Sequence, residues 1–356
     1  MIHHTGHLIW RGFQGTELPG WLADLIAAGR CGGIVVFGRN VADPRQVWGM
    51  ARSAAAAFPE RAGRFPVAID QEGGRVARLR EPDFTAFPPA RTIGVLGDER
   101  LARDAGRAVG EELAAVGINV DFAPVVDVQG SPGGVVGDRS FGGSPDAVAR
   151  MALAWLEGLE SSGVRGCVKH FPGHGDASCD SHLDLPTADG DASRLAGRHL
   201  PPFREAARRG AGAVMVGHIL VPHLDPDLPA TLSPRIAGGL LREGVGFEGV
   251  AIADDLEMGA ITKRMPVGEA AVLAVLAGCD ALLVCASRDL GDEAEEALDR
   301  EAATSPSFRD LVERSAARAR AFGASLIDPP PAFDPFGLRS PQHLAAAAAL
   351  LGDGGC

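Results

Sequence analysis

One short segment of the chain concentrates side chains that can transfer protons or bind anions. It runs from Lys169 to His182 and contains one lysine, three histidines and two aspartates. Its proline and glycines disfavour a helix. The run just before it, Val164–Val168, is apolar and typical of a short buried strand. We therefore expect these ionisable groups to stand where a strand ends in a loop, a common location for catalytic residues.

Asp180 and His182 are spaced for a proton-transfer pair. Residues two apart in an extended turn lie on one side of the chain, so the carboxylate of Asp180 can hydrogen-bond the imidazole of His182. The negative charge would favour the protonated imidazole. A histidine held in this way can donate a proton and later take one back. The alternative is an exposed histidine in a flexible loop.

Asp254 is a candidate nucleophile because it directly follows the apolar run Val250–Ala253. A lone carboxylate at a strand end is a standard nucleophile for glycosyl transfer. Side chains alternate along a strand, so only one of Asp254 and Asp255 is expected to face the active-site side. Capping of the following helix is the alternative role for an aspartate here, and it suits Asp255 better.

No metal and no other cofactor is predicted. His170 and His174 have the spacing of a helical zinc site, but Pro172, Gly173 and Gly175 disfavour a helix, and no Cys or Glu completes a familiar ligand set. The chain also lacks a Walker A pattern, a Gly-x-Ser-x-Gly elbow and a strand-linked Gly-x-Gly-x-x-G. Phosphate-cradle and serine-hydrolase functions therefore have no support.

Short apolar runs alternate with amphipathic helical segments along the whole chain. This alternation is typical of a parallel sheet covered by helices, and eight such units favour an α/β fold with a single (β/α)8 TIM barrel and long catalytic-face loops. We expect the barrel to occupy residues 1–327. Residues 328–356 are expected to form a Pro-rich C-terminal tail with a short helix at 343–351. The expected strands are Gly6–Trp10, Gly33–Phe37, Pro66–Ile69, Ile118–Phe122, Gly166–Lys169, Ala213–Gly217, Val250–Ala253 and Ala281–Cys285, and the clearest helices are Glu99–Ala115, Pro145–Ser162, Asp191–Gly210 and Pro266–Ala277.

Polar residues follow the expected strands in unusual density. Asp70 follows the third strand, Lys169 and His170 close the fifth, and Asp254 follows the seventh. In a parallel barrel these strand ends meet at one mouth, where active sites are built. The convergence predicts a single polar site at that mouth.

Composition excludes several classes of function. The 356 residues carry a net charge of -12, which argues against a nucleic-acid partner. No apolar run approaches the roughly 18 residues of a membrane span, and the first residues lack the pattern of a signal peptide. The six cysteines contain no Cys-x-x-Cys pair, so we expect reduced thiols and a cytoplasmic protein without membrane insertion. The oligomeric state is left open.

At these residues the sequence resembles glycoside hydrolase family 3, in particular its single-domain β-N-acetylglucosaminidase branch. The motifs that carry the resemblance span most of the chain in the expected order. They are Ile69–Val76, Asn119–Asp127, Gly137–Gly142, Lys169–Asp176 with Asp180–His182, and Ala253–Met258.

The resemblance implies a TIM barrel that cleaves terminal β-linked N-acetylglucosamine with retention of configuration. Asp254 matches the nucleophile, His182 the general acid/base and Asp180 its partner. The residues that match the pocket for the non-reducing sugar are Asp70, Arg78, Arg139, Lys169 and His170.

The resemblance also implies a substrate and a role. Family 3 β-glucosidases commonly take a glutamate acid/base from a second domain, whereas here the Lys169–Gly175 segment and His182 are expected to supply the acid. The implied partner is a small saccharide or muropeptide, N-acetylglucosamine joined to anhydro-N-acetylmuramic acid with or without peptide, in cell-wall recycling. The scarcity of aromatic residues, with no tyrosine in the chain, fits an exo-acting pocket better than a long cleft.

Two other functions remain open at this point. A phosphorylase would use phosphate instead of water, and a histidine acid/base would repel that phosphate less than a glutamate would. A barrel that only binds sugar is the second alternative. The set of Asp254, Asp180 and His182 argues against mere binding, because binding needs no nucleophile.

Overall fold

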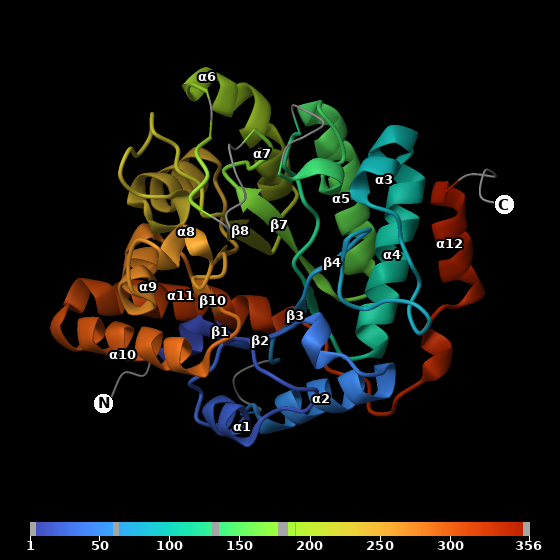
Figure 1. Cartoon of the computed structure of the whole chain (residues 1–356), viewed down its shortest axis with the longest axis horizontal. Helices are drawn as coiled ribbons and strands as arrows, with labels where there is room; N and C mark the ends of the chain where they lie inside the picture. The colour runs from blue at the N-terminus through green and yellow to red at the C-terminus, as the bar shows by residue number, and fades with distance from the viewer. Residues whose placement is uncertain (1–4, 60–63, 130–134, 177–183, 189, 352–356) are drawn as a thin grey trace.

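The computed structural model describes residues 5–59, 64–129, 135–176, 184–188 and 190–351. Eight parallel strands close into a barrel in the order β1-β10-β9-β8-β7-β6-β3-β2, with helices around it (Figure 1). This confirms the predicted TIM barrel. The barrel strands are β1 (Ile9–Arg11), β2 (Gly33–Val36), β3 (Val67–Ile69), β6 (Val120–Asp121), β7 (Arg165–Phe171), β8 (Ala213–Val216), β9 (Val250–Ala253) and β10 (Ala281–Val284).

Each predicted strand has a counterpart, but some boundaries differ. The first run begins with a 3₁₀ turn, η1 (Gly6–Leu8), and becomes a strand only at Ile9. The hairpin of β4 (Gln71–Gly73) and β5 (Val76–Ala77) was not predicted, because β4 has no apolar side chain and the apolar run of β5 is only two residues long.

Helices cover the outside of the barrel, and the apolar faces of these helices pack on the strands. The predicted helix at 191–210 is divided into α6 (Ala192–Arg194), a wide turn at Leu195–His199 and α7 (Leu200–Arg208). Pro201 and Pro202 lack the amide hydrogens that a continuous helix would need there. The other helices are α1 (Gly20–Ala27), α2 (Pro44–Ala57), α3 (Ala90–Leu96), α4 (Glu99–Ala115), α5 (Pro145–Ser161), α8 (Gly259–Thr262), α9 (Val267–Ala277), α10 (Arg288–Thr304), α11 (Pro306–Ala324) and α12 (Pro341–Leu351).

The interior of the barrel is filled by side chains from alternate strand positions. Trp10 stacks on Phe122 with ring centroids 6.2 Å apart, and Cys167, Ile252 and Leu283 belong to the same buried cluster. Small side chains such as Ala68 leave room for these rings. Because side chains alternate, the residue two positions further along each strand also faces inward, now at the mouth.

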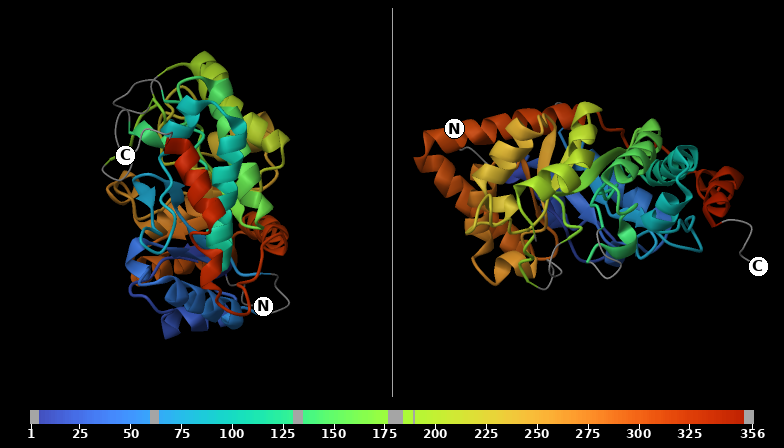
Figure 2. Two further views of the ribbon diagram at one scale, coloured as in Figure 1. Left: turned by 90° about the vertical axis from the view of Figure 1, so that its right-hand side faces the viewer. Right: turned by 90° about the horizontal axis from the view of Figure 1, so that it is seen from above.

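Residues 328–351 continue beyond the barrel helices. Trp48 on α2 donates a hydrogen bond from Nε1 to the carbonyl of Pro330 at 2.9 Å. A short 3₁₀ turn, η8 (Pro335–Gly337), follows. The chain then forms α12, which lies along α4 at one edge of the molecule (Figure 2).

Candidate active site

A cavity of about 190 Å³ opens at the carboxyl ends of the strands. All six of the predicted site residues that the structure describes line it together with apolar side chains from inside the barrel. The structure therefore brings together residues that are far apart in the sequence. The lining comprises Val35, Phe37, Asp70, Arg75, Val76, Arg78, Phe122, Val135, Val136, Arg139, Lys169, His170, His174, Met215, Asp254, Asp255, Met258, Leu283 and Cys285.

Strand alternation explains how the cavity acquires its polar walls. Asp70, Lys169 and Asp254 each stand two positions after an inward-facing residue of β3, β7 or β9. The pairing between β7 and β8 shifts register between Val168 and Phe171, so the strand is irregular where Lys169 and His170 both reach the cavity.

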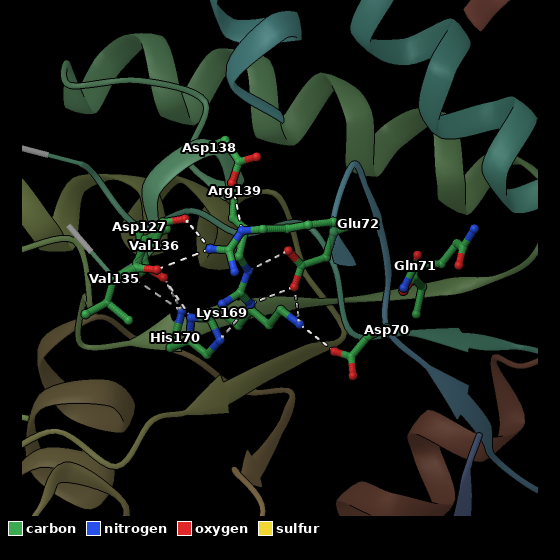
Figure 3. A network of polar contacts seen from close by, with 12 residues as sticks. Asp70, Gln71, Glu72, Asp127, Val135, Val136, Asp138, Arg139, Lys169 and His170 are labelled. Carbon is green, nitrogen blue, oxygen red and sulfur yellow. Dashed lines mark hydrogen bonds and ion pairs between the residues drawn. The ribbon is translucent and has the colours of Figure 1, made fainter. Parts of the chain in front are cut away.

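A buried ionic group occupies one wall of the cavity (Figure 3). Lys169 Nζ lies 2.7 Å from Asp70 Oδ1 and 2.7 Å from Glu72 Oε1, and only 2% of its side chain is exposed. Arg139 binds both oxygens of Glu72 through Nε and Nη2 at 2.8 and 2.7 Å. Burial alone would raise the pKa of Glu72, but Lys169 and Arg139 outweigh it and lower the pKa to about 2. All four groups are therefore charged at neutral pH.

The same wall retains unused hydrogen-bonding capacity toward a ligand. Arg78 Nη2 donates to Asp70 Oδ2 at 3.2 Å, and the two side chains are 29% and 17% exposed. Arg78 Nε and His174 Nδ1 are buried and have no hydrogen-bond partner among the described residues. A sugar presents many hydroxyl groups that both donate and accept, so it can satisfy such atoms.

Asp127 orients His170. Its Oδ2 lies 2.7 Å from His170 Nδ1, and its carboxylate also accepts the backbone N–H groups of His170 and His174 at 3.3 and 2.6 Å. Burial would raise the pKa of Asp127, but the two histidines overcome it and lower the pKa to about 2. With Nδ1 directed at this carboxylate, His170 presents Nε2, which lies 3.4 Å from Arg139 Nη2.

Asp254 and Asp255 both line the cavity, which corrects the expectation that only one of them would face it. β9 ends at Ala253, so strict alternation no longer applies to the next two residues. Asp255 also does not cap α8, whose N-cap is Met258. Its carboxylate instead accepts N–H groups from Glu257 and Cys285 at 3.1 and 3.3 Å.

The two aspartates differ in protonation. Burial raises the pKa of Asp255 to about 7. For Asp254 the same effect of burial is outweighed, chiefly by His218 and then by His170, so its pKa lies below the ordinary value. Asp254 is therefore the ionised carboxylate of the pair at neutral pH, as a nucleophile must be.

Asp180 and His182 lie outside the described residues. The preceding segment is anchored at Asp176, whose Oδ2 binds Arg194 at 2.6 Å and Arg198 at 3.2 Å and lies 3.1 Å from His199 Nε2. The placement of His182 at the active site therefore stays a prediction from the sequence.

Sequence reasoning placed Glu72, Asp127 and His218 among the polar residues at the strand ends but assigned them no role in the site. Glu72 and Asp127 follow the third and fourth strands, so the density of acidic residues at strand ends was the available signal. His218 follows β8 and bonds Thr231 Oγ1 and the carbonyl of Asp255, each at 2.9 Å. The partners of these three side chains come from other segments of the chain, so the contacts depend on how those segments are arranged around the barrel.

Among the described residues, no group of three or more His, Cys, Asp or Glu side chains could hold a metal ion. No helix among those residues is long and apolar enough to cross a membrane.

A barrel whose mouth gathers an ionised carboxylate, a buried lysine and an arginine–glutamate pair has the features of a sugar-cleaving enzyme. Residues 19–317 match the model of the glycosyl hydrolase family 3 N terminal domain. A beta-hexosaminidase of Alkalilimnicola ehrlichii is 37% identical over 280 residues, which make up 77% of this chain and 79% of that protein. The chain belongs to glycoside hydrolase family 3 and is a glycoside hydrolase.

Solved structures show the same architecture. A family 3 β-N-acetylglucosaminidase from Paenibacillus sp. str. FPU-7 is 38% identical with a TM-score of 0.91, over 97% of this chain and 67% of that chain. NagZ from Neisseria gonorrhoeae, in complex with N-trifluoroacetyl-D-glucosamine, is 32% identical with a TM-score of 0.74. That match covers 88% of this chain and 97% of the other.

Proposed function

We propose that this glycoside hydrolase is an exo-acting, retaining β-N-acetylglucosaminidase. The observation that carries the proposal is the placement of an ionised Asp254 in the same cavity as Lys169 and Arg139. The relatives named beta-hexosaminidase and β-N-acetylglucosaminidase support the choice of sugar. A cavity of about 190 Å³ suits one terminal sugar better than a long saccharide.

The ionic wall would hold the sugar ring while Asp254 attacks. Lys169, Arg139 and Asp70 would bind hydroxyl groups through charge-assisted hydrogen bonds, and Arg78 and His170 would complete the grip. These contacts orient the anomeric carbon toward the Asp254 carboxylate. The carboxylate then forms a glycosyl ester as the glycosidic oxygen departs.

His182 would serve as the acid and then the base, with Asp180 as its partner. In the first step His182 protonates the departing oxygen, and in the second it deprotonates the water that releases the sugar. The assignment rests on the sequence and on family resemblance. Asp255 would not compete with Asp254 as nucleophile, because its pKa of about 7 keeps much of it protonated.

For the natural substrate we propose a peptidoglycan fragment, N-acetylglucosamine linked to anhydro-N-acetylmuramic acid, cleaved in the cytoplasm during cell-wall recycling. Arg75 lines the cavity, and 53% of its side chain is exposed, although its Nε pairs with Asp138 at 2.9 Å. This guanidinium is placed to attract an aglycone that carries a carboxylate.

Turnover of p-nitrophenyl β-N-acetylglucosaminide, with and without inorganic phosphate, tests the proposal. We expect free N-acetylglucosamine at a rate that phosphate does not change. A sugar phosphate as product would identify a phosphorylase instead, and binding without turnover would identify a sugar-binding barrel.

A fluorinated glycosyl donor tests the nucleophile separately. A 2-fluoro or 5-fluoro N-acetylglucosaminyl-type donor slows release of the ester, so peptide mass spectrometry should find the label in Ile252–Met258 on Asp254. A label on Asp255 would overturn the assignment.

A further inference from the structure

The C-terminal segment reaches α4 and binds a pair of glutamates there. Arg339 N donates to Glu112 Oε1 at 2.8 Å, and His343 Nδ1 lies 3.2 Å from the same oxygen. His343 Nε2 lies 2.8 Å from Glu111 Oε2. Only 3% of His343 and 4% of Glu112 is exposed. Figure 2 shows α12 lying along α4, so these contacts fasten the segment to the barrel's outer layer.

Glu112 also holds the loop at residues 78–89, which connects β5 to α3. Thr85 donates its Oγ1 hydrogen to Glu112 Oε1 at 2.6 Å and its backbone N–H to Oε2 at 3.0 Å. Arg339 reaches the same loop, because its Nη1 donates to the carbonyl of Pro82 at 2.7 Å. The segment thus fastens this loop to α4 at two points.

On one side this loop supports Glu72 of the sugar pocket. Gly74 N donates to the carbonyl of Phe87 at 2.9 Å, so the loop is hydrogen-bonded to the turn directly after β4. A Cβ at Gly73 would lie 2.7 Å from the carbonyl oxygen of Pro88, which shows how closely the two backbones pack. Glu72 sits on β4 beside this contact.

On the other side the loop leads into α3, which supports Arg139. Arg91 Nη2 donates to the carbonyl of Gly137 at 3.3 Å. A Cβ at Gly94 would lie 1.7 Å from the carbonyl oxygen of Phe141, so α3 touches the backbone of the Arg139 segment. A displacement of the loop would therefore move both partners of the Glu72–Arg139 pair.

Arg339 has a backbone conformation that needs support. Its φ of 47° is the only positive φ of a non-glycine residue in the part of the chain that the structure describes. Such a conformation is unfavourable for a residue with a side chain and persists where surrounding contacts impose it. The contacts to Glu112 and Pro82 are those that hold it.

We infer that the C-terminal segment positions the sugar pocket. Arg339 and His343 act as positioning residues through Glu112, which in turn holds Thr85, and we call this set of contacts the brace. The inference rests on the proposed function, since it takes the wall of Glu72, Arg139 and Lys169 as the binder of the sugar. Loss of the brace weakens the grip on the sugar in the ground state and transition state alike. It should raise KM and leave kcat nearly unchanged.

The test compares His343→Leu and Thr85→Val with a matched control. Trp48→Phe removes the bond to Pro330, so it loosens the same segment without touching Glu112. The Kd of N-acetylglucosamine is measured by calorimetry, and kcat and KM with the aryl substrate, well below the Tm of each variant. We expect Kd and KM to rise about 3- to 10-fold in the two brace variants and kcat to stay within about twofold. The control variant Trp48→Phe should lower Tm and leave Kd, KM and kcat unchanged.

If the brace variants fold with a lowered Tm but bind N-acetylglucosamine as tightly as the unaltered chain, the positioning role is wrong. The proposed function is not affected by that result. If His343→Leu does not fold, Thr85→Val decides, because valine keeps the shape of threonine and removes only the hydroxyl bond to Glu112. An unaltered chain that neither binds N-acetylglucosamine nor cleaves the aryl substrate would overturn the proposed function and the brace with it.

Discussion

Buried ions at the two ends of the barrel have different surroundings. At the amino-terminal end, Asp280 accepts hydrogen bonds from Arg242, from Ala251 N at 2.9 Å, and from Ser315 Oγ and Arg318 Nη1 at 3.0 Å each; its side chain is 1% exposed.

The wall at the mouth also pairs its charges, but it borders a cavity. Asp70, Arg78 and Arg139 keep 17%, 29% and 17% of their side chains exposed. A buried ion whose bonds are all made within the protein ties elements together, whereas one that faces a cavity can still bind a ligand. We therefore expect substitutions at the mouth to change activity and those at the opposite end to change stability.

The largest effect is expected for Asp254→Asn. An amide cannot form the glycosyl ester, so kcat/KM should fall about 10⁴-fold or more. Stability should change little, because this carboxylate accepts a hydrogen bond from the N–H of Asp255 at 2.9 Å, and an amide oxygen can accept it as well. Steady-state kinetics and a thermal melt measure both quantities. Activity within tenfold of the unaltered enzyme would place the nucleophile elsewhere.

His182→Gly should separate substrates by their leaving groups. A phenolate departs with little protonation, so aryl glycosides should lose less activity in the first step than disaccharides, for which we expect roughly a 10²- to 10⁴-fold loss. Azide should partly restore the aryl activity by attacking the glycosyl ester without a base. Equal losses on both substrates, with no effect of azide, would make His182 a binding residue.

Arg139→Lys should reduce kcat/KM about 10²-fold, because lysine keeps the charge but cannot bind both oxygens of Glu72. The shape of the pH profile should not change, since Arg139 takes no part in proton transfer. Kinetics across the pH range provide the measurement. A shifted pH limb would instead give Arg139 a role in the acid/base step.

Asp280→Asn tests the opposite end of the barrel. It removes the counter-ion of Arg242 and Arg318, so the free energy of unfolding should fall by about 3–5 kcal/mol. The folded variant should keep kcat/KM within about twofold, because Asp280 is absent from the cavity lining. Denaturant titration and kinetics at low temperature measure the two effects. A large loss of kcat/KM in the folded variant would contradict the expectation that substitutions at this end change stability and not activity.

The smallest effect concerns Asp121, a buried carboxyl whose Oδ1 accepts a hydrogen bond from Gln71 N at 2.9 Å and whose Oδ2 has no partner among the described residues. Burial raises its pKa to about 8, above an unfolded value of about 3.9. Its folded form holds a proton that the unfolded chain releases, so stability is lost as pH rises from about 4 to about 8. Asp121→Asn should raise Tm at pH 8 by roughly 2–4 °C and leave it nearly unchanged at pH 4. Parallel Tm curves would refute this.

Local patterns made most of the fold predictable. Apolar runs such as Val250–Ala253 and amphipathic ones such as Glu99–Ala115 appear with the boundaries that the sequence indicates. The irregular parts were less predictable. The β4–β5 hairpin has no apolar alternation, and the wide turn before α7 depends on prolines inside a helical pattern.

The sequence by itself determined the barrel and the candidates Asp70, Lys169, His170 and Asp254, because strand periodicity and strand-end position are local properties. Only the tertiary structure decided which charges meet. Asp254 and Asp255 are neighbours of the same chemistry, yet their pKa values move in opposite directions, since His218 and His170 lie near the first while burial dominates at the second. Electrostatic environment depends on distances across the barrel, and no local pattern contains those distances.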